Sequence, residues 1–411
     1  MPIEIDAARL LSEIESLALI SEAAPPVVTR VVFTPADMRA RAWFAERCAE
    51  AGLSVRRDAI GNTFARWQGD LDAPVVGTGS HIDAIPNAGK FDGVVGVLGG
   101  LEAIRALQRS GFRPRCSIEL LLLTSEEPTR FGIGCLGSRL LAGTISPDAA
   151  RKLTDKEGES VETVRRNAGF TGALEDVKLP RGYYKAFVEL HIEQGPILER
   201  EKIPLGIVTK IAAPASARIT LEGSGGHAGG VVMPDRRDAL CAAAELILAI
   251  ERAAKTTGSP NTVATVGICD VFPGAVNSIP SRVRITLDLR DTNLTTRDAA
   301  MNAIDAAAKE ISARRGVSIA TEMLNSDAPA DSAPEIIDAL SAACKTHGER
   351  FMLMISRAYH DSLFLSRVAP MAMLFIPCRN GYSHRPDEYA SIEDISRGAL
   401  ILAEALATLS S

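Results

Sequence analysis

Residues Pro74–Gly100, PVVGTGSHIDAIPNAGKFDGVVGVLGG, join a predicted strand to a predicted helix. Pro74–Ser80 is a short apolar run that predicts a buried strand, and this strand ends at His81. Gly93–Gln108 follows a helical pattern, which Gly111 ends. A buried strand followed by a helix is the repeating unit of a doubly covered, largely parallel sheet. This stretch therefore predicts an α/β fold.

Further strands and helices continue the same alternation. Ser117–Thr124 and Tyr184–Leu190 are apolar runs that predict two more buried strands. Nearer the N-terminus, Asp6–Leu19 is amphipathic, and Thr34–Asp37 predicts the start of a helix that stops near Gly52. We expect a catalytic domain with a mixed, largely parallel sheet flanked by helices.

The middle of the chain follows a different order of elements. Strand, helix, strand, strand, helix and strand succeed one another, which is the split βαβ, ferredoxin-like plan of a compact α+β domain. The predicted elements are Ala217–Leu221, Asp238–Lys255, Thr262–Val271, Ser281–Arg290, Thr296–Arg314 and Val317–Met323. We therefore expect an inserted domain at residues 214–328 and a catalytic, metal-binding domain formed by residues 1–213 and 329–411.

Histidines and acids gather in a few short segments. These segments are Ser80–Asp83, Lys90–Gly93, Thr124–Glu127, His191–Gly195 and Tyr382–Pro386. Three of them come at the ends of predicted strands, and ligands of parallel α/β sheets collect beyond the carboxyl ends of the strands. Imidazole and carboxylate together suit zinc, manganese or cobalt, and two such ions can activate a water for attack on a carbonyl.

Individual residues in these segments have expected tasks. His81 and Asp83 lie two apart on an extended segment, so Asp83 can orient the imidazole of His81. Asp92 precedes a glycine-rich helix start, whose positive end favours a carboxylate able to bridge two ions. Of the neighbouring Glu126 and Glu127, one can bind metal while the other shuttles a proton. The glycines after Asp92 do not fit a GxGxxG nucleotide loop, so we expect them to allow close helix packing.

Seven longer motifs run through the chain: SHIDAIPNAGKFDGVVGVLGGLEAI, TSEEPTRFGIGCLGSR, ELHIEQGPILE, GSGGHAG, PGAVNSIPS, AYHDS and GYSHRPDEY. With these motifs the chain resembles the amidase, hydantoinase/carbamoylase family of dinuclear metallohydrolases, which is related to aminoacylases and metal-dependent exopeptidases. The resemblance covers nearly the whole chain, including the inserted domain. Within the family, HIDAIPNAGKFDGVVGVLGG, SEEPTRFG, SRAYHDS and IPCRNGYSH are most similar to members that act on ureidoglycolate.

This resemblance implies two divalent metal ions in each subunit. By it, His81, Asp92 and His191 hold one ion. Asp92, Glu127 and His384 hold the other. Manganese is the ion expected from the resemblance and from the share of carboxylates among the donors, and zinc fits the same donors.

The resemblance also assigns the general base and the contacts to substrate. Glu126 matches the base, and His227 matches a residue that reaches the partner subunit's site and polarises the scissile carbonyl. Asn277 and Arg290 match positions that bind the substrate carboxylate, a task that suits the planar fork of arginine. Further substrate contacts match Gln194, His360 and Tyr382. The inserted domain is expected to form a homodimer and to close over the site.

Some of these residues have plainer interpretations when the sequence is taken alone. Arg290 stands beside Asp288 and Asp291, which favours a surface ion pair. His227 fits a glycine-rich turn, and His360 fits a buried histidine with a satisfied hydrogen bond.

The expected reaction is hydrolysis of the ureido (N-carbamoyl) C–N bond of a small carboxylate, with Glu126 moving the proton from water to the leaving ammonia. The resemblance indicates ureidoglycolate as substrate, with glyoxylate, ammonia and carbon dioxide as products. N-carbamoyl-L-amino acids, allantoate and 3-ureidopropionate are alternative substrates. Alternatives of other classes are a catalytically silent ureide-binding protein and a thiol or serine hydrolase that uses Cys135, Cys378 or Ser125.

Composition narrows the partners and the location. The net charge of −6 argues against a nucleic-acid or anionic-membrane partner. No apolar stretch approaches the length of a membrane span, and the acidic N-terminus lacks the pattern of a secretory signal. Seven cysteines without a CxxC pair fit reduced, buried thiols. We therefore expect a cytoplasmic enzyme.

Overall fold

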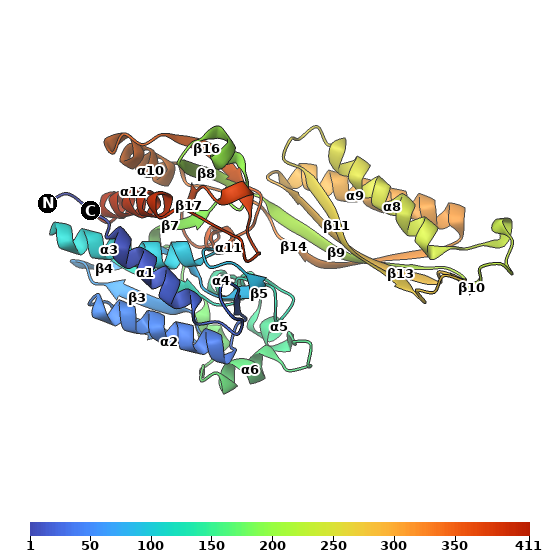
Figure 1. Cartoon of the computed structure of the whole chain (residues 1–411), viewed down its shortest axis with the longest axis horizontal. Coiled ribbons are helices and arrows are strands. Elements are labelled where there is room, and N and C mark those ends of the chain that lie inside the picture. The colour runs from blue at the N-terminus through green and yellow to red at the C-terminus, as the bar shows by residue number, and fades with distance from the viewer. The chain divides into compact units, whose positions relative to one another are not determined.

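The computed structural model describes residues 1–411, apart from the side chain of Ala73. The chain divides into two compact units, and Figure 1 labels the main elements of each. The first unit consists of Met1–Thr209, Asp331–Ser356 and His360–Ser411, and the second of Lys210–Ala330 and Arg357–Tyr359.

A nine-stranded mixed sheet forms the centre of the first unit. Its four middle strands are parallel, in the order β17 (Met371–Ile376), β7 (Tyr184–Ile192), β4 (Leu71–His81) and β6 (Cys116–Leu123). On one side, β8 (Leu205–Ile211) pairs antiparallel with β17, and β15 (Ala330–Asp331) and β16 (Phe351–Ser356) lie beside β8. On the other side, β3 (Thr63–Trp67) pairs antiparallel with β6, and β2 (Ser54–Arg57) pairs antiparallel with β3. The predicted mixed sheet is confirmed, and its parallel part is limited to the four central strands. A separate ribbon pairs β1 (Val28–Arg30) with β5 (Ala84–Ala88).

Helices cover both faces of this sheet. On β7, Leu190 points to α3 and α12, where a Cβ at Gly99 or at Gly398 would touch it. The neighbouring Glu189 instead accepts hydrogen bonds from Ser362 of α11. Because successive strand residues point to opposite faces, α11 lies on the face opposite α3 and α12. The helices of this unit are α1 (Ala7–Ala18), α2 (Pro35–Glu50), α3 (Val94–Ser110), α4 (Leu136–Ala142), α5 (Pro147–Lys152), α6 (Val161–Asn167), η1 (Leu174–Val177), α7 (Ile197–Glu201), α10 (Pro334–Thr346), α11 (Asp361–Leu365), η3 (Arg379–Gly381) and α12 (Ile392–Ser410).

Capping side chains begin the first helices where the sequence predicts them. Asp6 accepts a hydrogen bond from the Arg9 amide at 3.0 Å. Thr34 caps α2, and Pro35 occupies the first turn. The Asp37 carboxylate accepts a hydrogen bond from the Phe33 amide at 2.8 Å, which fixes the residue before the cap against the start of α2.

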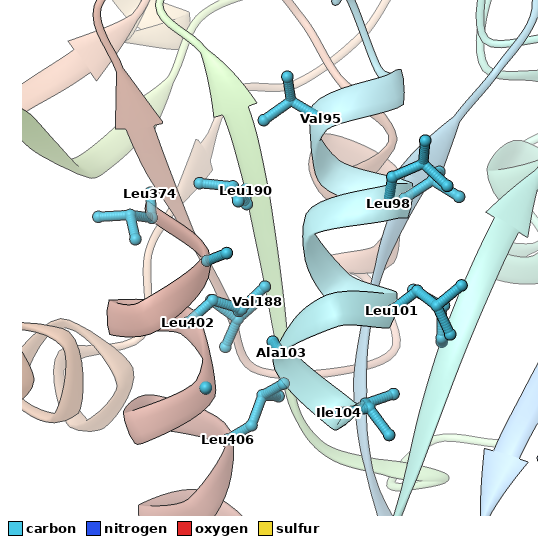
Figure 2. Close-up of a cluster of buried hydrophobic side chains, with 14 of the residues drawn as sticks. Val95, Leu98, Leu101, Ala103, Ile104, Val188, Leu190, Leu374, Leu402 and Leu406 are labelled. Atoms are coloured by element: carbon cyan, nitrogen blue, oxygen red, sulfur yellow. The ribbon is translucent and has the colours of Figure 1, made fainter. Parts of the chain in front are cut away.

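Glycines allow α3 to pack closely on the sheet. A Cβ at Gly96 would lie 2.4 Å from the carbonyl oxygen of Leu190, and one at Gly100 would lie 2.8 Å from Leu120 Cδ1. The predicted packing role of these glycines is therefore confirmed. Figure 2 shows the core that results, with side chains of α3, β7, β17 and α12 facing one another. Each leucine fully buried there contributes about 1.5–3 kcal/mol to stability.

The second unit is built on a four-stranded antiparallel sheet. The strand order is β11 (Val263–Phe272), β13 (Arg282–Asp291), β9 (Ala213–Glu222) and β14 (Ser318–Ser326). Helices α8 (Ala239–Lys255) and α9 (Leu294–Arg315) bury one face of this sheet. Along the chain the elements follow the predicted split βαβ order. A short ribbon of β10 (Gly226–His227) and β12 (Ser278–Ile279), and the turn η2 (Met233–Asp235), add to it.

The seven cysteines are all free, as the sequence predicts. Five are buried, whereas Cys241 and Cys269 are exposed, so the prediction of burial is wrong for these two. Cys269 lies on the edge strand β11 and Cys241 in the first turn of α8, where the sheet and helices of the second unit leave side chains uncovered. Among the described residues, no helix is both long and apolar enough to cross a membrane.

Candidate active site and metal centre

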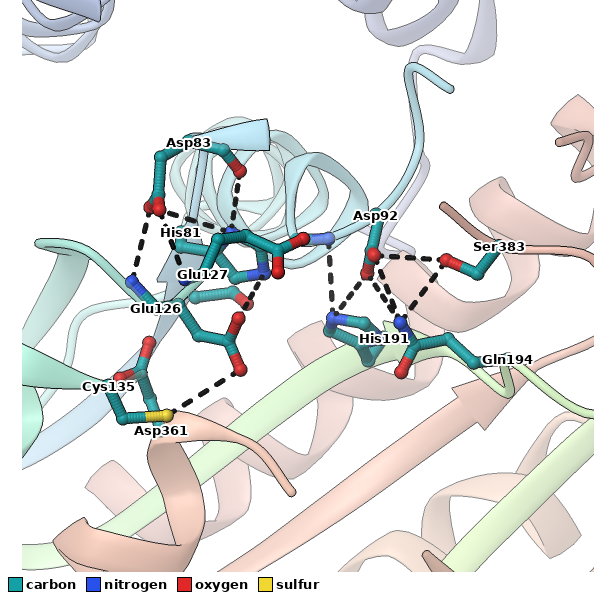
Figure 3. Close-up of polar contacts among 12 residues, drawn as sticks. His81, Asp83, Asp92, Glu126, Glu127, Cys135, His191, Gln194, Asp361 and Ser383 are labelled. Carbon is teal, nitrogen blue, oxygen red and sulfur yellow. Dashed lines mark hydrogen bonds and ion pairs between the residues drawn. The ribbon is translucent and has the colours of Figure 1, made fainter. Parts of the chain in front are cut away.

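The carboxyl ends of the parallel strands bring the predicted ligands together (Figure 3). His81 ends β4, His191 lies one residue before the end of β7, and Glu126 and Glu127 follow β6. Asp92 stands two residues before α3. Because the strands are neighbours and run the same way, residues far apart in the sequence meet at one edge of the sheet.

Backbone carbonyls orient the two buried imidazoles. His81 Nδ1 lies 3.0 Å from the carbonyl oxygen of Asp83, and His191 Nδ1 lies 2.9 Å from that of Ile192. Both Nδ1 atoms therefore carry the proton, and each Nε2 keeps a lone pair for a metal. The Gly93 amide donates to His191 Nε2 at 3.2 Å, which agrees with this tautomer. Asp83 orients His81 through its carbonyl, whereas its carboxylate, expected for this task, lies 3.7 Å from Nδ1.

Asp92 lies between two groups of candidate ligands. Its Oδ1 is 3.2 Å from His191 Nε2, and its Oδ2 is 3.0 Å from His384 Nε2. Gln194 Nε2 donates to both carboxylate oxygens, at 3.1 and 2.9 Å, and Ser383 Oγ donates to Oδ2 at 3.0 Å. Burial opposes ionisation, but the hydrogen bond from His384 and the nearby histidines hold the pKa of Asp92 below its usual range. Asp92 thus turns one oxygen to each group, which is the geometry that a bridging ligand needs.

His384 completes the second group with Glu127. Its Nε2 lies 3.2 Å from Glu127 Oε1 as well as close to Asp92. The His384 side chain is half-exposed, and its backbone has a φ of 61°. Hydrogen bonds to Asp92 and then to Glu127 raise the pKa of His384 to about 11. A metal ion that binds His384 must therefore displace a proton from its imidazole.

The Glu126 side chain is buried next to His81. The amides of Glu126 and Glu127 donate to the Asp83 carboxylate at 3.3 and 3.1 Å, which fixes the loop after β6. Glu126 Oε2 lies 3.7 Å from His81 Nε2. Burial, and then the charge of Glu127, raises the pKa of Glu126 well above its usual range. A buried carboxylate directed at the histidine cluster is suited to accept a proton.

The donors fit divalent cations. Two groups of close donors share Asp92: His81, Asp92 and His191 form the first, and Asp92, Glu127 and His384 form the second, with the ligand atoms of each group within 4.8 Å of one another. Burial also raises the pKa of the neighbouring Asp83 to about 8. Several buried carboxyl groups at one place repel one another unless cations or protons neutralise them. Mixed imidazole and carboxylate donors suit manganese or zinc.

Manganese binding to the metal-free chain is expected to release a proton at pH 7–8. The folded pKa of His384 is about 11 and its ordinary value is 6.5, so its proton stabilises the metal-free fold fully below pH 6.5, and this contribution is lost as the pH rises to about 11. Metal binds only the neutral imidazole, so its apparent affinity should rise up to about tenfold per pH unit. Titration calorimetry in two buffers of different ionisation enthalpy measures the proton count. Equal affinities at pH 7 and pH 8 would contradict this expectation.

Two buried acids near the site were not among the predicted residues. Glu189 accepts hydrogen bonds from Ser80 Oγ at 2.7 Å and from Ser362 Oγ at 2.5 Å. Glu388 accepts hydrogen bonds from the Phe91 and Asp92 amides, at 2.8 and 3.1 Å. An acid inside the apolar strand that carries His191 is a signal for Glu189 that the sequence does offer. For Glu388 the sequence offers only its place in the GYSHRPDEY motif.

Three predicted substrate contacts lie in the first unit. Gln194 is committed to Asp92, as described above, and also donates to Ser383 Oγ at 3.2 Å. His360 is buried, with Nε2 3.0 Å from Ser356 Oγ and its ring 4.5 Å from that of His191. The Arg385 guanidinium lies over the ring of Tyr382, with its Cζ 3.8 Å from the ring centre. His360 is thus adjacent to the metal-ligand group, whereas Gln194 first of all orients a ligand.

The other three predicted contacts lie in the second unit. His227 and Asn277 are neighbours, because His227 pairs with Ser278 and the Ala228 amide donates to the Asn277 carbonyl at 2.8 Å. His227 is exposed, and its Nδ1 accepts the Gly229 amide at 3.1 Å, so the neutral ring carries its proton on Nε2. The Arg290 guanidinium holds both oxygens of Asp288, at 2.7 and 3.0 Å, and donates to the Arg357 carbonyl at 3.0 Å. The ion pair expected from sequence alone is therefore present, and its acid is Asp288.

Comparison with known proteins gives the family. Residues 77–408 match the sequence profile of peptidase family M20/M25/M40. The chain is 50% identical over 417 residues to the ureidoglycolate hydrolase of Oryza sativa subsp. japonica, which covers 100% of this chain and 86% of the rice protein. The crystal structure of AtUAH in complex with glyoxylate has a TM-score of 0.91 and 48% identity, and the match covers 99% of this chain and 98% of that one. An amidase of the hydantoinase/carbamoylase family from Burkholderia multivorans has a TM-score of 0.89 and 34% identity over 99% of this chain and 98% of its own. The chain therefore belongs to peptidase family M20/M25/M40, among its hydantoinase/carbamoylase-type amidases.

Proposed function

We propose that this protein hydrolyses the ureido C–N bond of ureidoglycolate and leaves glyoxylate, ammonia and carbon dioxide. The observation that carries the proposal is the pair of ligand groups that share Asp92, with Glu126 beside His81. The rice relative is named for ureidoglycolate, and the AtUAH structure holds glyoxylate, the product expected from this reaction. Both the family and the donor groups support metal dependence, and we assign two manganese ions to each subunit.

Divalent ions at the two groups would polarise the ureido carbonyl and lower the pKa of a water. Glu126 takes the proton of the attacking water, for which its buried carboxylate and raised pKa suit it. It then gives this proton to the leaving nitrogen. His227, with its proton on Nε2, can donate a hydrogen bond to the carbonyl oxygen as charge develops there.

Arg290 and Asn277 bind the substrate carboxylate in this proposal. The Arg290 fork already holds one carboxylate, that of Asp288, in the paired geometry that a substrate carboxylate would adopt. Asp288 and the substrate therefore compete for the same donors. Binding of substrate requires that Asp288 yield at least one of its two hydrogen bonds.

The test is ammonia release by the manganese-loaded protein on ureidoglycolate, allantoate, N-carbamoyl-L-amino acids and 3-ureidopropionate. Preference for ureidoglycolate, with glyoxylate formed, is the expected result. Preference for a carbamoyl amino acid would contradict the assignment of ureidoglycolate as substrate but would leave the proposed roles of the residues unchanged. Turnover that survives a chelator would contradict the metal chemistry and favour a thiol or serine hydrolase, and no activity on any substrate would favour a silent ureide-binding protein.

We also propose that the second unit is a lid and the site of homodimer formation. Its edge strand β11 is paired on one side only, and Val263, Ile268 and Phe272 on this strand are exposed. An exposed apolar edge strand is a template for pairing with a second copy of the chain. A reduced cytoplasmic location agrees with the free cysteines.

Ile268→Lys is expected to weaken the dimer by about tenfold or more, because a charged side chain on an edge strand disfavours pairing. Light scattering after size exclusion, over a range of protein concentrations, measures the mass. Leu353→Lys changes an exposed residue of the first unit and is the matched control, which should keep the mass of the unaltered protein. A monomer before any substitution, or an unchanged mass for Ile268→Lys, would argue against this interface.

A further inference from the structure

A thiol lies behind Glu126, on the side away from the histidines (Figure 3). Cys135 Sγ is 3.6 Å from Glu126 Oε1, whereas Oε2 is 3.7 Å from His81 Nε2. The two oxygens of this carboxylate therefore have different neighbours. Oε1 accepts a hydrogen bond from the thiol, and Oε2 faces the metal-ligand group.

The backbone fixes the thiol at this place. The Cys135 amide donates to the Glu126 carbonyl at 2.8 Å, and the next two amides of the chain donate to the Ser125 and Thr124 carbonyls at 2.9 and 2.8 Å. Cys135 has a φ of 58° and stands at the start of α4. Cysteine adopts this left-handed conformation at a cost of order 1 kcal/mol, and such positions persist where the surroundings determine them. The side chain is completely buried, so its direction is set by this backbone.

The second neighbour of the thiol is Asp361 of α11. A thiol has one proton and can donate it to one carboxyl group at a time. Asp361 already accepts a hydrogen bond from Ser138 Oγ at 2.5 Å. Burial raises the pKa of the Cys135 thiol well above its usual range, so the sulfur keeps its proton. Its distance of 3.6 Å from Glu126 Oε1 allows the thiol to donate this proton in a hydrogen bond to Glu126.

We infer that Cys135 is a positioning residue for the general base, and that its S–H holds Glu126 Oε1 so that Oε2 takes the proton from water. This inference rests on the proposed function, in which Glu126 is the base. The terminal torsion of a glutamate side chain is broad and roughly two-fold, so it does not by itself hold the carboxylate in one orientation. A donor on one oxygen restricts that rotation and directs the other oxygen to the reaction.

The experiment compares Cys135→Ala with Cys135→Ser, both loaded with manganese and assayed on ureidoglycolate. Cys135→Ala removes the donor, and kcat should fall about tenfold with KM and metal content unchanged. Cys135→Ser keeps a hydroxyl donor in the same place and should restore kcat to within about threefold of the original. Cys344→Ala, which shortens a buried cysteine of α10 in the main core, should lower Tm and leave kcat unchanged.

Three outcomes separate the explanations. An unchanged kcat in Cys135→Ala, or equal losses in the Ala and Ser variants, would overturn the positioning role. A fall in kcat that follows Tm alone, as judged against Cys344→Ala, would also overturn it and leave Cys135 as a packing residue. Glu126→Gln in the same assay tests the proposed function separately: if the unaltered protein is active and Glu126→Gln is not, failure of the Cys135 variants concerns only this inference.

Discussion

Glu126→Gln is expected to lower kcat on ureidoglycolate by about 10³–10⁴-fold, with the metal content of the unaltered protein retained. The amide has the shape of the carboxylate but cannot take a proton from water. In the structure, Glu126 belongs to none of the groups of candidate ligands, whereas Glu127 lies in the group of Asp92 and His384. Loss of activity without loss of metal is therefore the specific expectation, measured by ammonia release and by elemental analysis of the same sample.

The matched control is Glu201→Gln, an exposed glutamate at the end of α7 that pairs with Arg200. It should leave both activity and metal content unchanged. Loss of metal from Glu126→Gln would instead assign Glu126 as a ligand. Retained activity would mean that another group takes the proton, and the role of general base would pass from Glu126.

Asp92→Asn is expected to lower metal content at both positions and to lower kcat/KM by about 10³-fold or more. Asp92 is the one residue common to the two groups, and each of its oxygens lies close to a histidine of a different group. The amide can offer one oxygen only. It also places a hydrogen-bond donor where Gln194 and Ser383 already donate, which adds a repulsive contact.

Single-group variants make this test specific. His191→Gln and His384→Gln each remove a ligand from one group, so each should lower the metal content mainly at one position. Asp387→Asn is the control, because Asp387 lies in the same loop as His384 but pairs with the exposed Arg385. If Asp92→Asn keeps two ions per subunit, Asp92 does not bridge them, and the assignment of the two groups is wrong.

Local patterns made the strands, the helices and the meeting of the ligands predictable. The apolar runs of β4, β6 and β7 each lead to residues of the site, which are His81, then Glu126 with Glu127, and His191. Parallel pairing then follows from the alternation with helices, and it places the strand ends at one edge. Capping residues such as Thr34 and Asp238 set helix starts within a few residues of those expected, since a cap acts on amides of its own turn.

Contacts between segments distant in sequence were not predictable in this way. The carbonyl of Asp83, rather than its carboxylate, orients His81, because the carboxylate is taken up by the amides of the loop after β6. Glu388 reaches the amides of residues 91 and 92 from almost 300 positions along the chain, at a separation of 297 from Phe91. No local periodicity records such a contact, because it depends on how two loops pack.

Residue types and their order along the chain are thus enough to state the fold class and the candidate ligands, because secondary structure and ligand chemistry are local properties. The family and the division of the ligands into two groups follow from the resemblance of the longer motifs. Only the tertiary structure decides which atom of each residue makes the contact that matters in the site. Gly93 illustrates this: its φ is 66°, and a Cβ there would lie 2.5 Å from His81 Nε2, so the imidazole keeps its place only beside a glycine. Cys135 behind Glu126 is a second case, since its thiol acquires a task only where packing brings it to one oxygen of a buried carboxylate. Burial and distance, which arise only when the segments pack together, decide these interactions.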